Sequence, residues 1–194
     1  MEKGRLEAFT DGVIAVIITI MVLELKAPHE ASWQALIENW PIMLSYVLSF
    51  IYVGIYWNNH HHLLHLAENV NGKVMWANLH LLFWLSLFPF VTSWLNEAQP
   101  LPAPVPTALY GFVLLMAAIS WIPLMRTLIN CNGGRESELQ KAIRSTWKEW
   151  VSVVVYATAI ALAFFIPIVS CGLYAAVAVM WFVPDRRIED KVTA

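Results

Sequence analysis

Long apolar runs separated by short polar segments dominate the chain. Six of these runs approach the length of about 20 mostly apolar residues that a membrane-spanning helix requires. Tryptophans stand near the ends of several runs, as is typical of the membrane–water interface. The pattern therefore predicts an all-α integral membrane protein with six transmembrane helices. These helices are expected at residues 6–25, 40–57, 74–94, 106–125, 150–166 and 169–183.

The connections between the runs also carry recognisable signals. Residues 99–106 include four prolines and are expected to form a loop, since prolines at this density do not sustain a helix. The last two spans are expected to form a tight hairpin around Pro167 and residues 170–172. Residues 136–148 are polar with helical propensity and predict a short cytoplasmic helix. No segment indicates a separate soluble domain, so residues 1–194 are expected to form one transmembrane domain.

The basic residues indicate how the six helices are oriented. Of the 12 lysines and arginines, all except Lys26 fall before the first span, after the second, after the fourth or after the sixth. Cytoplasmic segments of membrane proteins carry an excess of lysine and arginine. Both the N-terminus and the C-terminus are therefore expected to be cytoplasmic.

Composition excludes several classes of function. Hydrophobic residues make up 59% of the chain and charged residues 13%, whereas a soluble domain carries about 25% charged residues. The formal net charge of −2 gives no reason to expect a nucleic acid as partner. A His-Glu-x-x-His motif, a Gly-rich phosphate loop and a serine nucleophile with a plausible base are all absent from the sequence. We therefore expect no enzyme and no cofactor, with the lipid bilayer as the surrounding partner.

The first predicted helix has two distinct faces when its residues are placed at about 100° intervals. Its apolar face would pack on neighbouring helices or lipid, or line the pore of an oligomer. In a pore, rings of its larger side chains would form hydrophobic constrictions that gate by dewetting. This face comprises Phe9, Gly12, Val16, Thr19, Ile20 and Leu23, and the opposite face comprises Glu7, Asp11, Ile14, Ile18 and Leu25.

Asp11 is a carboxylate close to the start of a membrane helix, and such a costly group requires an explanation. In a structural interpretation, Arg5 or a histidine after the second helix neutralises it and fixes the packing of the helix. In a functional interpretation, it binds a proton or a cation. The sequence alone leaves both interpretations open.

These residues also carry a resemblance to a known family. The pattern R-x-x-x-F-T-D-G-V-x-A-V from Arg5 to Val16 resembles the first-helix signature of the transmembrane protein 175 family of potassium channels. The Tyr-Trp-Asn-Asn-His-His stretch at 56–61 resembles a second family motif. Asn78-Leu79 together with Leu-Phe-Pro-Phe at 87–90 resembles a third.

The resemblance implies a homotetrameric, potassium-permeable channel in a bacterial cell (inner) membrane, because the chain contains a single six-helix unit. It implies a pore lined by Val16, Thr19, Ile20 and Leu23, with hydrophobic rings and a threonine layer. The Thr-Val-Gly-Tyr-Gly filter of other potassium channels is absent, so selectivity would come from the first helix. The pore would be wider at Val16, where the family commonly has a larger residue. A polar network away from the axis would contain Arg5, Phe9, Thr10 and Asp11.

Histidines near the second and third helices are further candidates for functional groups. His60 and His61 belong to the second matched motif, and His80 is expected to join a network with Asp11 or Asn78. His61 and His65 have the i,i+4 spacing of metal ligands on a helix. Only the Glu68 carboxylate is near them in sequence, so we expect no metal site. Protonation of these imidazoles near neutral pH could modulate a channel.

Two other functions remain open at the level of sequence. A proton-coupled small secondary transporter would use Asp11 and His80 as its coupling site. Such transporters usually contain broken helices near the middle of the membrane, and Gly and Pro are scarce within the predicted spans. A non-conducting scaffold would show no ion flux at all.

Overall fold

The computed structural model describes residues 2–28, 30–142 and 147–182. This part of the chain is helical, which confirms the predicted all-α fold class for the described residues. Its elements are α1 (Lys3–Leu23), α2 (Trp33–Glu38), α3 (Trp40–His65), α4 (Gly72–Leu85), α5 (Phe88–Glu97), α6 (Pro104–Cys131), the 3-10 helix η1 (Gly134–Glu136), α7 (Glu138–Ala142), α8 (Trp147–Ala163) and α9 (Pro167–Phe182).

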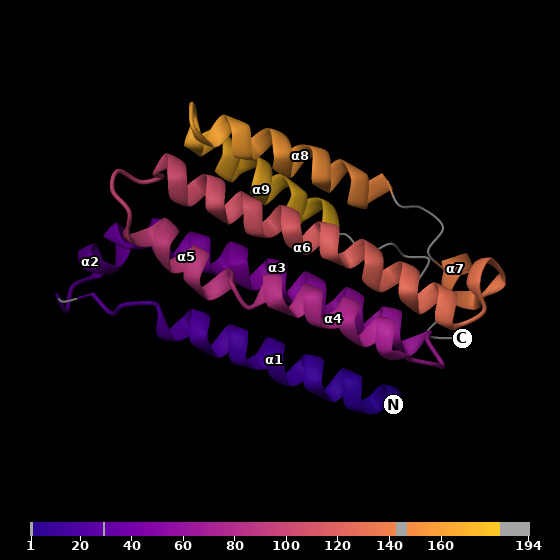
Figure 1. The fold of residues 1–194 in the computed structure, drawn as a ribbon. Helices are drawn as coiled ribbons and strands as arrows, with labels where there is room; N and C mark the ends of the chain where they lie inside the picture. The colour runs from indigo at the N-terminus through magenta and orange to yellow at the C-terminus, as the bar shows by residue number, and fades with distance from the viewer. Residues whose placement is uncertain (1, 29, 143–146, 183–194) are drawn as a thin grey trace.

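The long helices form a bundle in which neighbours lie side by side along a common direction (Figure 1). Helix α1 lies along one side of the bundle, and the pair α8 and α9 lies along the other, with α6 beside this pair. Helices α3, α4 and α5 fill the space between α1 and α6. The short helix α2 marks one end of the bundle, and α7 marks the end at which α1 begins.

Helix α1 contributes one narrow stripe to the core. Leu6, Thr10, Ile14, Ile17 and Met21 are buried, and their spacing of three or four residues places them on one side of the helix. This stripe packs against α3, α4 and α5. Val13 and Ile18 flank the stripe and are partly buried against the core, whereas the side of α1 away from the stripe is exposed.

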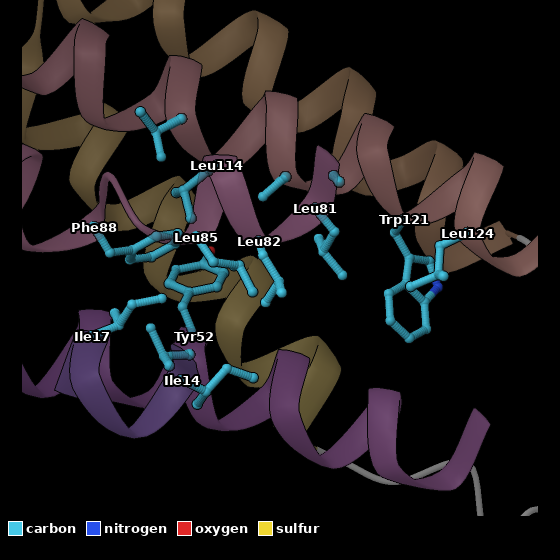
Figure 2. Packing of buried hydrophobic residues seen from close by; sticks show 14 of the residues in the cluster. Ile14, Ile17, Tyr52, Leu81, Leu82, Leu85, Phe88, Leu114, Trp121 and Leu124 are labelled. Carbon is cyan, nitrogen blue, oxygen red and sulfur yellow. The ribbon is translucent and has the colours of Figure 1, made fainter. Parts of the chain in front are cut away.

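The core is centred on Tyr52 of α3. Figure 2 shows its ring between Ile14 and Ile17 of α1 and the side chains of Leu85 and Phe88. The rings of Tyr52 and Phe88 are tilted relative to each other, with centroids 6.3 Å apart. The close packing of these side chains joins α1 to α3, α4 and α5.

The span predicted at 74–94 lies within a run from Gly72 to Glu97 that is long and apolar enough to cross a membrane, but this run consists of two helices, α4 and α5, with a break at residues 86–87. Pro89 is the physical cause. It has no backbone N–H to donate to the carbonyl of Leu85, and its ring clashes with that carbonyl in a continuous helix. Helix α5 starts at Phe88, so Pro89 lies in its first turn, where a missing N–H costs nothing.

The predicted loop at 99–106 is also too long. Helix α6 begins at Pro104, so Pro104 and Pro106 both lie in its first turn, where proline is tolerated because the N–H groups have no intrahelical partner.

The turn predicted for the last hairpin also lies at a different place. Helix α9 begins at Pro167 and includes residues 170–172, which were expected to form the turn.

The remaining helix boundaries differ less from prediction. Helix α1 covers Lys3–Leu23 instead of 6–25, α3 continues from the predicted end at 57 to His65, and α8 begins at Trp147 and ends at Ala163 instead of covering 150–166. Residue 183 of the predicted last span and residues 143–146 of the predicted cytoplasmic helix lie outside the described residues.

Within residues 2–28, 30–142 and 147–182, four helical runs are long and apolar enough to cross a membrane by length and composition. They are α1, α3, the run from Gly72 to Glu97 that contains α4 and α5, and α6. Helices α8 and α9 are shorter, with 17 and 16 residues. The count of six spans therefore stays a prediction.

Substitution of Gly111 by alanine is expected to destabilise the contact between α6 and α9. A Cβ atom at Gly111 would lie 2.0 Å from the hydroxyl oxygen of Tyr174, which is buried and donates a hydrogen bond to the Thr107 carbonyl (3.1 Å). Overpacking of this kind typically costs about 1–3 kcal/mol. Thermal unfolding in detergent should show a lower midpoint for Gly111→Ala.

Gly54→Ala is the matched control, because a Cβ at Gly54 meets no atom within 4 Å. Its unfolding midpoint should equal or exceed the wild-type value, because alanine is favoured over glycine in the interior of a helix. Equal midpoints for the Gly111 and Gly54 variants would show that the close approach to Tyr174 is not a constraint on the fold.

Candidate pore-lining helix

The face of α1 that the sequence singles out is exposed along its whole length. Val16, Ile20 and Leu23 are 55%, 42% and 79% exposed, and Phe9 and Thr19 are exposed as well. Large apolar side chains in such a continuous arrangement typically contact lipid or another protein surface. This face is therefore available to a second molecule, whereas the buried stripe on the other side is occupied by the chain's own helices.

Thr19 is the hydroxyl-bearing residue in this exposed face. Its Oγ1 donates a hydrogen bond to the carbonyl of Val16 at 2.8 Å. The hydroxyl hydrogen therefore points back to the helix. The two lone pairs of the oxygen remain available to bind a cation or to accept a hydrogen bond from a water molecule.

A buried chain of hydrogen bonds supports α1 from behind, towards the end of the bundle that carries α7. The side-chain amide nitrogen of Asn78 in α4 donates to Thr10 Oγ1 at 2.8 Å. The amide oxygen of Asn78 lies 2.8 Å from Nε2 of His60 in α3. Because this oxygen can only accept, Nε2 of His60 carries the proton in this arrangement. All three residues are buried.

Two pairs closer to the surface flank this buried chain, one exposed and one with a half-buried carboxylate. The indole Nε1 of Trp57 donates to Oδ1 of Asp11 at 2.9 Å. One turn nearer the N-terminus, His61 Nδ1 lies 3.4 Å from a carboxylate oxygen of Glu7, and this pair becomes an ion pair when the imidazole is protonated. The Asp11 carboxylate thus has a partner from the second predicted span, which is an indole and not a basic group.

The opposite end of α1 is connected to α5. The Ser93 hydroxyl donates to the carboxylate of Glu24 at 2.9 Å, and Lys26 forms an ion pair with Glu97. The hydrogen bond and the charge of Glu97 raise the pKa of the exposed Lys26 ammonium. Exposed pairs of this kind contribute little to stability, but these two define where the end of α1 lies relative to α5.

The predicted network is only partly assembled within one chain. Thr10, Asp11, His60 and His61 contact groups of neighbouring helices, as described above. Arg5 and Phe9 are exposed, and among the described residues Arg5 forms no ion pair.

The expectation that His80 joins Asp11 or Asn78 is wrong. His80 Nε2 accepts a hydrogen bond from Trp84 Nε1 at 3.0 Å and lies 3.5 Å from the Ser120 hydroxyl. The position next to Asn78 is taken by His60. Asp11 and His80 therefore do not form a joint site, and nothing in the arrangement favours a proton-coupled transporter.

Sequence reasoning missed three of the supporting residues. Trp57 was interpreted as an interfacial anchor, although an indole N–H inside a membrane helix also needs an acceptor. Nothing in the sequence around Glu7 and Ser93 marks them as partners of His61 and Glu24.

Within the described residues, no group of three or more His, Cys, Asp or Glu side chains could hold a metal ion.

Loss of the Asn78 side chain is expected to weaken the support of α1. In Asn78→Ala, Thr10 and His60 would lose their shared buried partner, and leaving a buried polar group unsatisfied costs about 1–3 kcal/mol. The unfolding midpoint in detergent should fall clearly below that of Asn58→Ala, because Asn58 is exposed on α3. If both variants unfold at the same temperature, the buried chain of hydrogen bonds does not stabilise the fold.

The long apolar helices, with polar groups paired between them, are those of an α-helical integral membrane protein. A sequence profile described as the endosomal/lysosomal potassium channel TMEM175 matches residues 5–89. A potassium channel from Chryseobacterium sp. (strain P1-3) is 52% identical over 192 residues, which cover 99% of this chain and 98% of the relative. The chain belongs to the TMEM175 family, an ion channel family and not an enzyme family.

Two further comparisons agree with this assignment. A potassium channel from Streptomyces collinus is 35% identical over 136 residues, covering 65% of this chain and 66% of that protein. The crystal structure of a lysosomal potassium-selective channel TMEM175 homologue from Chamaesiphon minutus superposes with a TM-score of 0.80 and 28% identity, covering 94% of this chain and 97% of that one.

Proposed function

We propose that the protein is a homotetrameric, potassium-permeable cation channel whose pore is lined by α1. The observation that carries the proposal is the continuous exposure of Val16, Thr19, Ile20 and Leu23 on a helix whose other side is packed and hydrogen-bonded to its own chain. The names of the bacterial relatives, which are potassium channels, support the choice of ion.

The exposed surface of α1 divides into two adjacent stripes, which suits a helix that contacts both a pore and a neighbouring subunit. Small residues form one stripe at Ala8, Gly12 and Ala15, and larger apolar residues form the other, which includes Val16 and Ile20. Thr19 lies beside Gly12, close to the boundary between the two stripes. Small side chains let two membrane helices approach closely. The stripe of small residues is therefore the proposed contact between α1 helices around the axis.

In this arrangement four Thr19 hydroxyls form a ring of oxygens with their lone pairs directed to the axis. A potassium ion would exchange part of its hydration shell for these oxygens and then pass the Ile20 and Leu23 rings. Hydrophobic rings exclude water when narrow and conduct when they dilate. The apolar rings are thus the gate, and the threonine layer offers the site where the ion sheds water.

The proposal includes six spans, with both termini in the cytoplasm of a bacterial cell. Helices α8 and α9 form an adjacent pair of about 25 Å in length, close to the hydrocarbon thickness of about 30 Å. Basic residues at the end of the bundle that carries α7 include Lys3, Lys73, Arg126 and Lys141, whereas Lys26 follows the other end of α1. Bacterial sources of the similar channels support the inner membrane as location.

The role of the Thr19 oxygen is tested with two variants of nearly equal size. Thr19→Val removes the hydroxyl and keeps the shape, so the permeability of potassium relative to sodium should fall. Thr19→Ser keeps the hydroxyl and should retain most of this preference. Reversal potentials in planar bilayers measure both. An unchanged preference in Thr19→Val would remove Thr19 from the proposed selectivity layer.

A further inference from the structure

Helices α4 and α6 pack side by side and run in opposite directions (Figure 1). Each of them has a stripe of exposed residues on the side that no other helix of the chain covers. The spacing of three or seven residues keeps the members of a stripe on one side of their helix. The members are Lys73, Trp76 and Phe83 in α4, and Phe112, Ile119 and Arg126 in α6.

The two basic residues of these stripes lie at the same level of the bundle. Nε2 of His80 in α4 lies 3.5 Å from the hydroxyl oxygen of Ser120 in α6, which aligns the two helices. Lys73 precedes His80 in α4, and Arg126 follows Ser120 in α6. Because the helices are antiparallel, the rise per residue places both charges about 10 Å from this contact, towards the end of the bundle that carries α7.

The positive charges of Lys73 and Arg126 are not balanced by carboxylates of the described residues. Helices α4 and α6 contain no Asp or Glu, and neither basic residue forms an ion pair within the part of the chain that the structure describes. Glu68 is the nearest carboxylate to Lys73 in sequence and pairs with neither of them there. The Trp76 indole, one turn after Lys73, is 75% exposed and adds a further hydrogen-bond donor. This end of the two stripes therefore favours a negatively charged acceptor.

The remainder of the two stripes is apolar. Phe83, Phe112 and Ile119 are all exposed, and the Phe112 ring meets the Trp84 ring of α4 edge to face, with centroids 5.7 Å apart. From Lys73 to Phe83 the helix rises about 15 Å. This length is about half of the 30 Å hydrocarbon core of a bilayer, so the apolar part matches the acyl chains of one leaflet.

We propose that this face of α4 and α6 is a binding site for an anionic phospholipid. The phosphodiester accepts hydrogen bonds from Lys73, Arg126 and the Trp76 indole, and the acyl chains extend along Phe83 and Phe112. Basic sites between transmembrane helices bind lipid head groups of this kind. The site contains no residue of α1, so it does not depend on the proposed pore. Only its assignment to the cytoplasmic leaflet rests on the proposed orientation.

The test measures the binding of single lipids to the full chain in detergent by native mass spectrometry. Dioleoylphosphatidylglycerol is the anionic probe, and dioleoylphosphatidylcholine, with the same acyl chains, is the zwitterionic comparison. We expect the anionic lipid to bind more tightly. Lys73→Gln and Arg126→Gln should each weaken its binding about fivefold and leave the binding of the zwitterionic lipid nearly unchanged. Lys3→Gln removes the same charge at the same end of the bundle, but on α1, and should leave both affinities unchanged.

Two further measurements separate a lipid site from a site for free anions and from an effect on the fold. Lys73→Arg keeps the charge and should retain most of the affinity for the anionic lipid. Inorganic phosphate should not displace this lipid, because it makes no apolar contacts. Equal affinities for the two lipids, unchanged affinity in both Lys73→Gln and Arg126→Gln, or an equal loss in Lys3→Gln would overturn the proposal. Displacement by inorganic phosphate would overturn it as well, since the charges would then bind a free anion.

Discussion

Replacement of Ile20 and Leu23 by alanine, singly and together, is expected to raise the single-channel potassium conductance several-fold and to weaken the preference for potassium over sodium. Both side chains are exposed on α1 in the isolated chain. Truncation widens the two apolar rings of the proposed tetramer. A wider ring stays filled with water, and an ion passes it with more of its hydration shell intact. Single-channel recording in planar bilayers measures the conductance, and bi-ionic reversal potentials measure the preference.

Val22→Ala is the matched control for this pair. Val22 is 46% exposed, but its helical position points well away from the Ile20 and Leu23 stripe. Its conductance and ion preference should equal those of the wild type. Unchanged currents in the Ile20 and Leu23 variants would show that neither residue lines the pore. The exposed face of α1 would then be a surface that contacts lipid.

Gly12→Leu is expected to abolish both tetramer formation and potassium current while the single chain stays folded. A Cβ at Gly12 meets no atom within 4 Å in the chain, so a leucine there has room to extend outwards. In the proposed tetramer the same position lies in the stripe of small residues, where a leucine would hold neighbouring α1 helices apart. Native mass spectrometry reports the assembly, and circular dichroism reports the helical content.

Gly172→Leu provides the comparison, since a Cβ at Gly172 in α9 also meets no atom within 4 Å. This variant should remain tetrameric and conduct. If Gly12→Leu assembles and conducts like the wild type, the contact between subunits does not involve the stripe of small residues on α1, and another surface would have to surround the pore.

The sequence predicted those features of the fold that depend on local periodicity. The 3.6-residue repeat places Val16, Ile20 and Leu23 on one face of α1, and all three are exposed. It does not predict the packed stripe, since Ile14 is the one buried residue of α1 that stands on the predicted opposite face. The break between α4 and α5 was equally local, since Pro89 lacks the N–H that a continuous helix needs. A proline inside an apolar run is a local signal, and it is sufficient to place this break.

The pairing of polar groups could not be predicted in the same way. Whether His60 or His80 reaches Asn78 depends on how α3 and α4 are rotated about their axes. That rotation depends on packing between helices that are distant in sequence, and it leaves no signature in the spacing of the histidines. The partner of Asp11 was similarly expected to be a base, whereas the structure supplies the Trp57 indole.

The most direct test of the proposed channel is the reversal potential of the purified protein in a planar bilayer with potassium on one side and sodium on the other. A potassium-permeable channel predicts a steady current whose reversal potential lies towards the potassium equilibrium potential. A reversal potential at zero would contradict potassium preference. Absence of current, together with electroneutral flux that depends on a proton gradient, would contradict the channel itself.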